Sequence, residues 1–326
     1  MKVLITGGAG FIGSYLARAY LERGDEVYVI DDLSTGSLNN VRPFMQHPLF
    51  HFVQDTILNR DIMLELMGTC DVIAHLAAAV GVRLIIDEPL RSIHTNIVGT
   101  EIVLELADKF RKKTFLASTS EVYGRNSQVP LKETDMRIYG STHVARWSYA
   151  ATKAMDEFLA LAYYRTKQLP IIIARFFNTV GPRQTGRYGM VIPRFVGQAL
   201  RNEPITIYGE GTQTRNFTYV GDVVRGVIGL IDEPRAVGGI FNIGGNEEIS
   251  INELAARIKT ITNSSSPFQH VPCDEAYTEG FEDMERRVPD ISRIANLIGY
   301  KNTCSLDDIL IKVVEFERAR QASKEE

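Results

Sequence analysis

The sequence predicts an α/β fold in which helices cover both faces of a parallel sheet. Two observations predict it. Short apolar segments alternate with longer segments of helical periodicity through the first half of the chain, and a glycine-rich turn directly follows the first apolar segment. Apolar segments without a polar side are typical of strands that are buried on both faces. Such a doubly wound sheet binds its ligands at the carboxyl ends of the strands.

The order of the elements predicts two unequal parts. Strands are expected at Lys2–Thr6, Glu26–Asp31, Phe50–Gln54, Val72–Leu76, Thr114–Ser118 and Ile171–Phe176, and helices at Phe11–Arg23, Leu90–Lys109 and Tyr149–Lys167. After Gly181 and Pro182 the elements become shorter, with helices expected at Val191–Arg201 and Val220–Leu230 and a strand at Ile205–Tyr208. We therefore expect a Rossmann-type nucleotide-binding domain over residues 1–180. A smaller, interleaved C-terminal α/β lobe over residues 181–326 would mainly bind substrate, with some chain crossing back.

Composition narrows the classes of function that the chain can serve. The 326 residues carry a formal net charge of -4 and are 44% apolar, which suits a large core and provides no basic surface for nucleic acid. The cysteines Cys70, Cys273 and Cys304 fit no zinc or disulfide spacing, so we expect reduced thiols and no metal. No signal segment and no apolar run near the ~18 residues of a membrane span stands out. A cytoplasmic protein without nucleic-acid or membrane partners is expected.

A glycine-rich turn joins the first predicted strand to the first predicted helix. Gly7–Gly13 has glycines at its first, fourth and seventh positions, which allow a tight turn, a close pyrophosphate and close packing of helix on strand. Asp31 and Asp32 end the second strand, where a carboxylate binds an adenosine ribose and repels a 2′-phosphate. The cofactor is therefore predicted to be NAD rather than NADP. Asp55 could bind the adenine, or could simply cap a loop.

Tyr149 and Lys153 are spaced to share one face of a helix. A tyrosine with a pKa of about 10 is a poor base, but a neighbouring lysine and a positive nicotinamide would lower that pKa. Tyr163 and Lys167 repeat the spacing about 21 Å further along the same helix, so only one pair can reach the cofactor. Tyr149 is closer to the predicted helix start and is favoured as the base. Tyr163 is interpreted as a surface or packing residue.

Hydroxyl and acidic residues follow the fifth predicted strand, at the edge where substrate should bind. Thr119 is a candidate to hydrogen-bond the substrate hydroxyl, and Glu121 is a candidate acid or base. Taken alone, such residues more often cap the end of a strand. Their combination with the glycine-rich turn and Tyr149 favours a catalytic role.

Motifs in order along nearly the whole chain add a family resemblance. They are His75–Ala78, Ser118–Gly124, Tyr149–Lys153, Arg175–Arg183, Gln213–Arg215 and Arg287–Asp290. Together with the glycine-rich turn, this set resembles the extended short-chain dehydrogenase/reductases, and among them the sugar-nucleotide 4-epimerases, decarboxylases and 4,6-dehydratases. The resemblance implies an NAD-dependent enzyme that oxidises the C4 hydroxyl of a sugar nucleotide, with a UDP-sugar expected.

The resemblance also implies roles for individual residues. Tyr149 would be the base, Lys153 would orient the nicotinamide ribose, Thr119 would hold the sugar O4 and Glu121 would complete the catalytic set. Cofactor contacts would come from Gly7, Gly10, Phe11, Ile12, Asp31, Asp32, Ser34, Thr35, Gly36, Asp55, Thr56, Leu76, Ala77, Ala78, Asn96, Ser118, Tyr149, Lys153 and Phe176. Substrate contacts would come from Ser120, Asn178, Val191, Thr206, Tyr208, Arg215 and Arg287, with Asn178 on the diphosphate, residues 206–208 around the base, and the two arginines clamping phosphate. Arg83 and Arg187 are further candidates to bind a carboxylate, with a surface role as the favoured alternative.

The fate of the 4-keto sugar separates three reactions. Return of hydride to the other face gives a 4-epimer, loss of a C5 carboxylate gives a decarboxylase, and loss of water gives a GDP-mannose-type 4,6-dehydratase. The second half of the chain favours the epimerase, whereas Glu121 fits it poorly. An NAD-sensing protein on the same fold is the non-enzyme alternative. By the same resemblance, the helices at Leu90–Lys109 and Tyr149–Lys167 would form a homodimer through Ile102, Leu106, Phe158 and Leu161.

Overall fold

Short runs of β-branched and aliphatic residues form a seven-stranded parallel sheet at the centre of the molecule. The computed structural model describes residues 1–81, 85, 87–186, 190–272, 284 and 286–325. The strands lie in the order β11-β6-β5-β4-β1-β2-β3. Their bounds are β1 (Lys2–Thr6), β2 (Glu26–Ile30), β3 (Phe50–Val53), β4 (Val72–His75), β5 (Lys113–Thr119), β6 (Ile171–Phe176) and β11 (Ile240–Ile243).

This sheet confirms the predicted doubly wound fold. Each of the six predicted strands is present to within one residue at either end. The seventh, β11, was not predicted: it comes from the second half of the chain and pairs with β6 in parallel, Ile240 beside Ile173. The sequence pattern could not reveal this pairing, because β11 is a short segment far from its partner in the chain. The domain boundary at residue 180 stays a prediction. The strand β11, which completes the central sheet, comes after that boundary in the chain.

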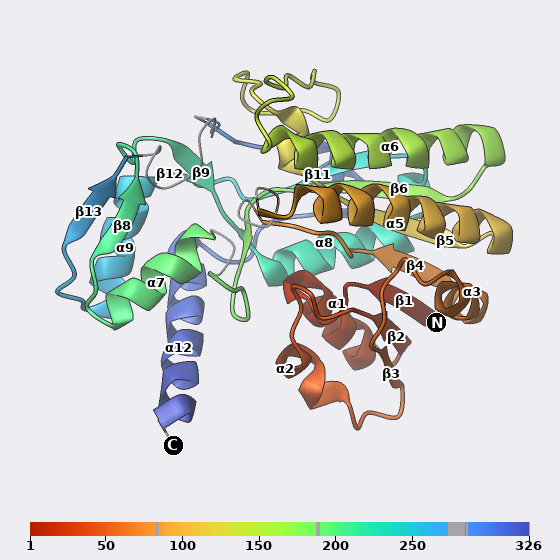
Figure 1. Ribbon diagram of the computed structural model, residues 1–326, viewed down its shortest axis with the longest axis horizontal. Coiled ribbons are helices and arrows are strands. Elements are labelled where there is room, and N and C mark those ends of the chain that lie inside the picture. Colours follow the sequence, from red (N-terminus) through yellow and green to blue (C-terminus); the bar gives the residue numbers. More distant parts are fainter. Residues whose placement is uncertain (82–84, 86, 187–189, 273–283, 285, 326) are drawn as a thin grey trace.

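Helices cover both faces of the sheet (Figure 1). One face carries α3 (Arg60–Thr69), α5 (Pro89–Phe110) and α6 (Trp147–Lys167); the other carries α1 (Phe11–Glu22), α8 (Val220–Asp232) and α11 (Ser292–Ile298). Ile102 and Leu106 lie in the buried cluster between α3 and α5, 4% and 3% exposed. The prediction that these two residues face a partner is therefore wrong, because α3 already covers them.

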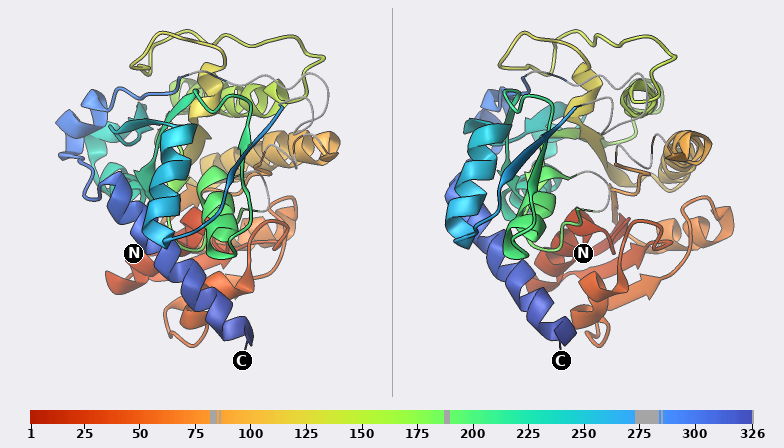
Figure 2. Two further views of the ribbon diagram at one scale, coloured as in Figure 1. Left: turned by 90° about the vertical axis from the view of Figure 1, so that its left-hand side faces the viewer. Right: turned by 60° about the vertical axis from the view of Figure 1, so that its left-hand side comes forward.

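The remaining elements form a second lobe with its own apolar core (Figures 1 and 2). They are α7 (Val191–Leu200), α9 (Ile251–Thr262), α12 (Leu306–Glu325) and the paired strands β7 (Thr179–Val180) with β10 (Thr218–Tyr219), β8 (Ile205–Tyr208) with β13 (Phe268–Val271), and β9 (Thr214–Asn216) with β12 (Glu248–Ser250). A capping box between Ser250 and Glu253 starts α9. Phe195, Ile258 and Leu310 are buried where α7, α9 and α12 meet.

Short helices occupy several connections. They are α2 (Leu38–Val41), η1 (Arg42–Phe44), η2 (Ser120–Tyr123) and η3 (Pro234–Ala236). Because all seven strands of the central sheet run in the same direction, the residues that follow them gather at one edge. Among these residues is η2, directly after β5.

Candidate active site

A cleft of about 430 Å³ lies at the carboxyl ends of the central strands. Its lining residues come from the connections after β1, β2, β3, β4, β5 and β6, and from the first turns of α1 and α6. In a doubly wound fold this edge is where a dinucleotide binds. Arg287, from the second half of the chain, also lines the cleft.

The glycine-rich turn has the shape that a dinucleotide requires. Gly7 has a φ of 71°, and a side chain there would lie 2.9 Å from the backbone of Ala77. A Cβ on Gly13 would overlap the carbonyl oxygen of Gly7, so the first turn of α1 packs directly on the loop. Gly10 is the N-cap of α1 and supplies no side-chain cap. The free N–H groups at this helix start line the cleft and suit a pyrophosphate.

Asp31 is buried at the end of β2 and also lines the cleft. Its two carboxylate oxygens accept hydrogen bonds from the backbone N–H groups of Ala9 (2.9 Å) and Leu33 (2.8 Å). Burial raises the pKa of Asp31, and these two hydrogen bonds oppose that rise. A carboxylate offers about four lone-pair sites, so the backbone N–H groups of Leu33, Ala9 and Gly10 leave room for a ribose hydroxyl. The residues around Asp31 thus fit NAD, in which the ribose carries no 2′-phosphate.

Most of the other predicted cofactor residues also line the cleft. They are Phe11, Ile12, Asp32, Ser34, Thr35, Asp55, Thr56, Leu76, Ala77, Ala78, Ser118 and Phe176. Asp55 accepts from the side chain of Asn59, the N-cap of α3, at 2.8 Å, so it also shapes its own loop.

Two predicted cofactor residues, Gly36 and Asn96, lie behind the lining. A side chain on Gly36 would meet Asp31 at 2.8 Å, and buried Asn96 holds the backbone N–H of Ala79 at 2.8 Å. Both positions therefore support residues of the cleft and do not line it themselves.

The four residues predicted to be catalytic converge on this cleft. Thr119 ends β5, Glu121 lies in η2, and Tyr149 and Lys153 share one face of α6. The Thr119 side chain opposes the rise in the pKa of the Tyr149 hydroxyl that burial causes, so the two groups act on each other in the cleft. Tyr163 packs among apolar residues between α5 and α6, away from the cleft. The choice of Tyr149 over Tyr163 therefore agrees with the geometry.

Lys153 does not lower the pKa of Tyr149 in the way that the sequence suggested. The Nζ of Lys153 donates to Asp156 at 2.8 Å, and both side chains are buried. Burial, then the negative charges of Glu121 and Asp156, raise the pKa of Tyr149 above its usual value. The expectation overlooked Asp156, one turn further along α6, which neutralises the lysine.

Glu121 lies between two arginines. Arg287 donates to it at 2.8 Å and Arg146 at 3.4 Å, and all three residues line the cleft. Burial alone would raise the pKa of Glu121, but Arg287 and Arg146 outweigh it and lower that pKa to about 2. The glutamate therefore stays ionised at neutral pH. Two guanidinium groups therefore lie beside Glu121 at this end of the cleft.

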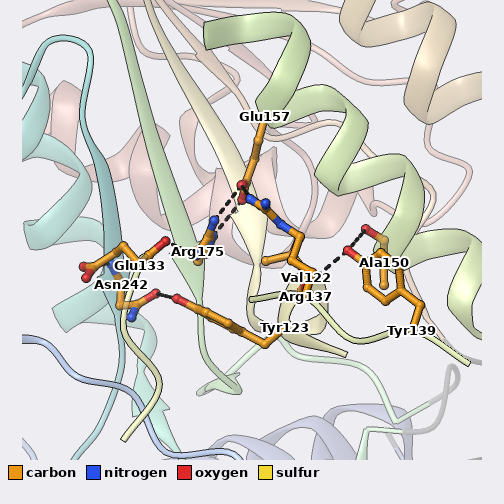
Figure 3. A network of polar contacts seen from close by, with 10 residues as sticks. Val122, Tyr123, Glu133, Arg137, Tyr139, Ala150, Glu157, Arg175 and Asn242 are labelled. Atoms are coloured by element: carbon orange, nitrogen blue, oxygen red, sulfur yellow. Dashed lines mark hydrogen bonds and ion pairs between the residues drawn. The ribbon is translucent and has the colours of Figure 1, made fainter. Parts of the chain in front are cut away.

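A buried ion-pair network fixes α6 against the sheet (Figure 3). Glu157 accepts from Arg175 on β6 at 2.8 and 2.9 Å, from Arg137 at 2.5 Å, and from the Ser118 hydroxyl at 2.6 Å. Burial raises the pKa of Glu157, but Arg175 and Ser118 outweigh it and lower the pKa overall. Because Ser118 precedes Thr119, the network sets the position of Thr119 relative to α6.

The predicted substrate residues divide into two groups. Ser120, Asn178 and Arg287 line the cleft, whereas Val191, Thr206, Tyr208 and Arg215 do not. Thr206 hydrogen-bonds the side chain of Gln198 on α7, and the ring of Tyr208 stacks under Arg194. Arg215 is buried, and its charge helps to lower the pKa of Glu121. Their substrate roles stay predictions, and Arg83 and Arg187 lie outside the described residues, as does Cys273.

Several residues that line the cleft were given no individual role from the sequence, although residues 121–146 and 185–193 were expected to shape the substrate pocket. Among them are Ala79, Arg146, Thr179, Gln184, Thr185 and Met190. Arg146 was the most accessible to prediction, because it stands three residues before Tyr149 at the start of the same helix. The others carry no chemical signal in the sequence and reach the cleft through the path of the chain.

The described part of the chain contains neither a cluster of metal ligands nor a helix that could span a membrane. No cluster of three or more histidine, cysteine, aspartate or glutamate residues there could hold a metal ion. None of the described helices has both the length and the apolar composition to cross a bilayer.

Together, the sheet, the glycine-rich turn and a Tyr–x–x–x–Lys pair at one cleft define an extended short-chain dehydrogenase/reductase. The chain belongs to the family described as GDP-mannose 4,6 dehydratase, whose model matches residues 4–313. This family consists of NAD-dependent epimerases, dehydratases and related enzymes of sugar nucleotides.

Three relatives show what the chain is similar to. It is 40% identical to UDP-N-acetyl-alpha-D-glucosaminuronate decarboxylase of Bacillus cytotoxicus, over 97% of this chain and 98% of that protein. It is 35% identical to UDP-glucuronic acid decarboxylase 1 of Arabidopsis thaliana, over 100% of this chain and 72% of that protein. Its fold matches UDP-glucuronic acid 4-epimerase of Bacillus cereus in complex with UDP-glucuronic acid and NAD, with a TM-score of 0.89, 32% identity and coverage of 98% and 100%.

Proposed function

We propose that this protein is an NAD-dependent decarboxylase of a UDP-linked hexuronate. The observation that carries the proposal is Glu121 held between Arg146 and Arg287 in the cleft. The two guanidinium groups that line the cleft suit a substrate with a carboxylate at C6, because guanidinium groups bind carboxylates through paired hydrogen bonds. Sequence analysis favoured 4-epimerisation. The decarboxylases at 40% and 35% identity support changing that preference.

The residues of the cleft have separate roles in this reaction. When bound, NAD⁺ would take up the hydride from C4 of the sugar. Tyr149 Oη would accept the proton of the 4-hydroxyl, and Thr119 would hold that hydroxyl in place. In the resulting 4-keto uronate the carboxylate is β to the ketone. When the C5–C6 bond breaks, carbon dioxide leaves and the electron pair moves towards O4, which gives an enolate that takes up a proton at C5. The hydride would then return to C4 while Tyr149 returns its proton to O4, so that the product has lost CO2 alone.

Glu121 argues against dehydration. A 4,6-dehydratase needs an acid to protonate the departing hydroxyl and a base to remove the C5 proton. A carboxyl group with a pKa of about 2 is a weak base at neutral pH and holds no proton to donate. In the proposed reaction Glu121 instead holds Arg146 and Arg287 in the cleft.

Epimerisation of the same substrate is the second candidate. The likeness to UDP-glucuronic acid 4-epimerase favours it, because that enzyme also takes a hexuronate. The two reactions share the oxidation at C4 and differ only in whether the C5–C6 bond breaks.

Product mass distinguishes the candidates. The purified protein is incubated with NAD⁺ and, separately, with UDP-glucuronate and UDP-N-acetylglucosaminuronate, and UDP-glucose serves as the uncharged control. Loss of one CO2 from either uronate, with UDP-glucose unchanged, is the expected result. An unchanged mass with an inverted C4, seen by NMR, would instead establish the epimerase. NAD binding without turnover of any sugar would favour the sensor alternative.

The exposed face of α6 supports the homodimer proposed from the resemblance. Ala151, Met155, Phe158 and Ala162 are exposed and recur with the spacing of one helix face. Met155 and Phe158 are 54% and 59% exposed. Leu161 is partly buried in the cluster between α5 and α6 and is less available to a partner.

A further inference from the structure

A row of buried polar side chains leads from Lys153 into the interior behind the cleft. Lys153 and Asp156 form an ion pair of 2.8 Å, with side chains 3% and 2% exposed. The Thr100 side chain on α5 opposes the rise in the pKa of Asp156 that burial causes, and its hydroxyl lies 3.2 Å from His75 Nε2. His75 Nδ1 in turn lies 2.8 Å from the hydroxyl of Thr6, at the end of β1.

The ring of His75 links two hydroxyl groups. Ala77 N–H donates to Thr6 Oγ1 at 3.1 Å, and the same hydroxyl lies 2.8 Å from His75 Nδ1. Burial, helped by the charge of Lys153, lowers the pKa of His75 to about 3. The ring is therefore neutral, and it donates to one of Thr6 and Thr100 and accepts from the other. Asp156 accepts from Lys153, and the Thr100 side chain opposes the rise in its pKa that burial causes.

We propose that Asp156 is a positioning residue that acts through Lys153. It is the buried counter-ion of the lysine, at 2.8 Å, and its pKa is influenced by the neighbouring Thr100 side chain. Its negative charge lies behind the part of the cleft that Lys153 and Tyr149 line, so it favours a positively charged ligand there. It therefore favours the oxidised over the reduced nicotinamide. The proposal rests on the proposed roles of Tyr149 and Lys153, not on the product released.

The other charged groups near this pair have partners of their own. Two neighbouring carboxylates are each held by two arginines. Glu157, the next residue on α6, pairs with Arg137 and Arg175. Glu121, in η2, pairs with Arg146 and Arg287. On α5, Glu101 and Glu105 are exposed. Asp156 is therefore the carboxylate whose removal changes the charge at Lys153 most directly.

Asp156→Asn tests the charge while keeping the shape. The amide oxygen can still accept from Lys153, but the negative charge is gone. Binding of NAD⁺ and of NADH is measured by calorimetry without any sugar nucleotide. We expect the ratio of the NAD⁺ to the NADH dissociation constant to rise on the order of fivefold or more, as for the loss of one buried charge. An unchanged ratio would overturn the proposal, because a merely structural defect weakens both ligands alike.

The same variant should shift the titration of Tyr149. Asp156 is one of the charges that raise the pKa of Tyr149. Without that charge the pKa falls, so the phenolate forms at lower pH. The rising limb of the pH–rate profile should therefore move to lower pH by about half a unit or more. A limb that stays in place would also count against the proposal.

Thr100 variants test the row without touching the ion pair. Burial raises the pKa of Asp156, and Thr100 opposes that rise. Thr100→Val should therefore let Asp156 become protonated at higher pH, so the NAD⁺ to NADH ratio should increase as the solution becomes more acidic. Thr100→Ser keeps the hydroxyl and should therefore keep the wild-type ratio of dissociation constants. If the two variants gave the same ratio at every pH, Thr100 would have no influence on the charge of Asp156. These binding measurements stay informative even if no decarboxylation is found.

Discussion

Tyr149 and Tyr163 show how far a single residue's role follows from spacing. Both belong to a Tyr–x–x–x–Lys pair on α6, yet of the two only Tyr149 lines the cleft, where Thr119 influences its pKa. The helix start, two residues before Tyr149, determines which of the two reaches the ends of the strands. The local sequence pattern therefore identified two candidates for the catalytic base. Tyr149 is selected because it lies at the end of α6 that is close to the carboxyl ends of the strands.

Replacing each tyrosine in turn tests that selection. Tyr149→Phe should lower kcat by roughly 10²–10⁴-fold, because the group that takes the 4-hydroxyl proton is lost. Tyr163→Phe, with the same chemical change on the same helix, should remain near the wild-type rate. Product formation from a UDP-uronate, followed by mass, gives both rates. Full turnover by the Tyr149 variant would remove this residue from the mechanism.

At the scale of elements, the turn between β1 and α1 is the most sharply specified feature. Gly13 lies inside the first turn of α1, where a side chain would collide with the Gly7 carbonyl that shapes the loop. Helix propensity favours alanine over glycine, so any loss from alanine here must come from packing. The element thus depends on close contact between helix and loop more than on its intrinsic helical tendency.

Gly13→Ala should weaken NAD⁺ binding by on the order of tenfold or more, since overpacking of this kind costs about 1–3 kcal/mol. Gly68→Ala on α3 is the matched control, because its Cβ would have a comfortable 3.7 Å contact with the Phe110 ring. The control should keep full affinity and gain about 0.5–1 kcal/mol of stability. Calorimetry and thermal unfolding check the two effects, and equal affinities in both variants would refute the steric argument.

At the scale of the whole molecule, α6 exposes a row of apolar side chains that the single chain does not cover. Phe158 is 59% exposed and stacks with Arg137, while Met155 lies one turn before it. Exposed large apolar side chains at helical spacing are typical of a subunit interface. Because α6 also carries Tyr149 and Lys153, an interface there would brace the helix of the active site.

Phe158→Glu should convert the proposed homodimer into a monomer at micromolar concentration, since a buried unpaired charge at the interface is unfavourable. Ile311→Glu is the control, as Ile311 is 43% exposed on α12, away from α6 (Figure 1). Sedimentation velocity measures both. A wild-type protein that sediments as a monomer would end the dimer proposal.

The sequence by itself determined the doubly wound sheet, the glycine-rich turn and the set of Thr119, Tyr149 and Lys153. These features depend on short-range periodicity and on residues a few positions apart, which a linear pattern records. Only the tertiary structure decided that β11 completes the sheet and that Arg287 meets Glu121. It also placed Asp156 beside Thr100 and His75, which come from other elements. Such contacts join distant parts of the chain, and their energies depend on burial and charge that no spacing expresses.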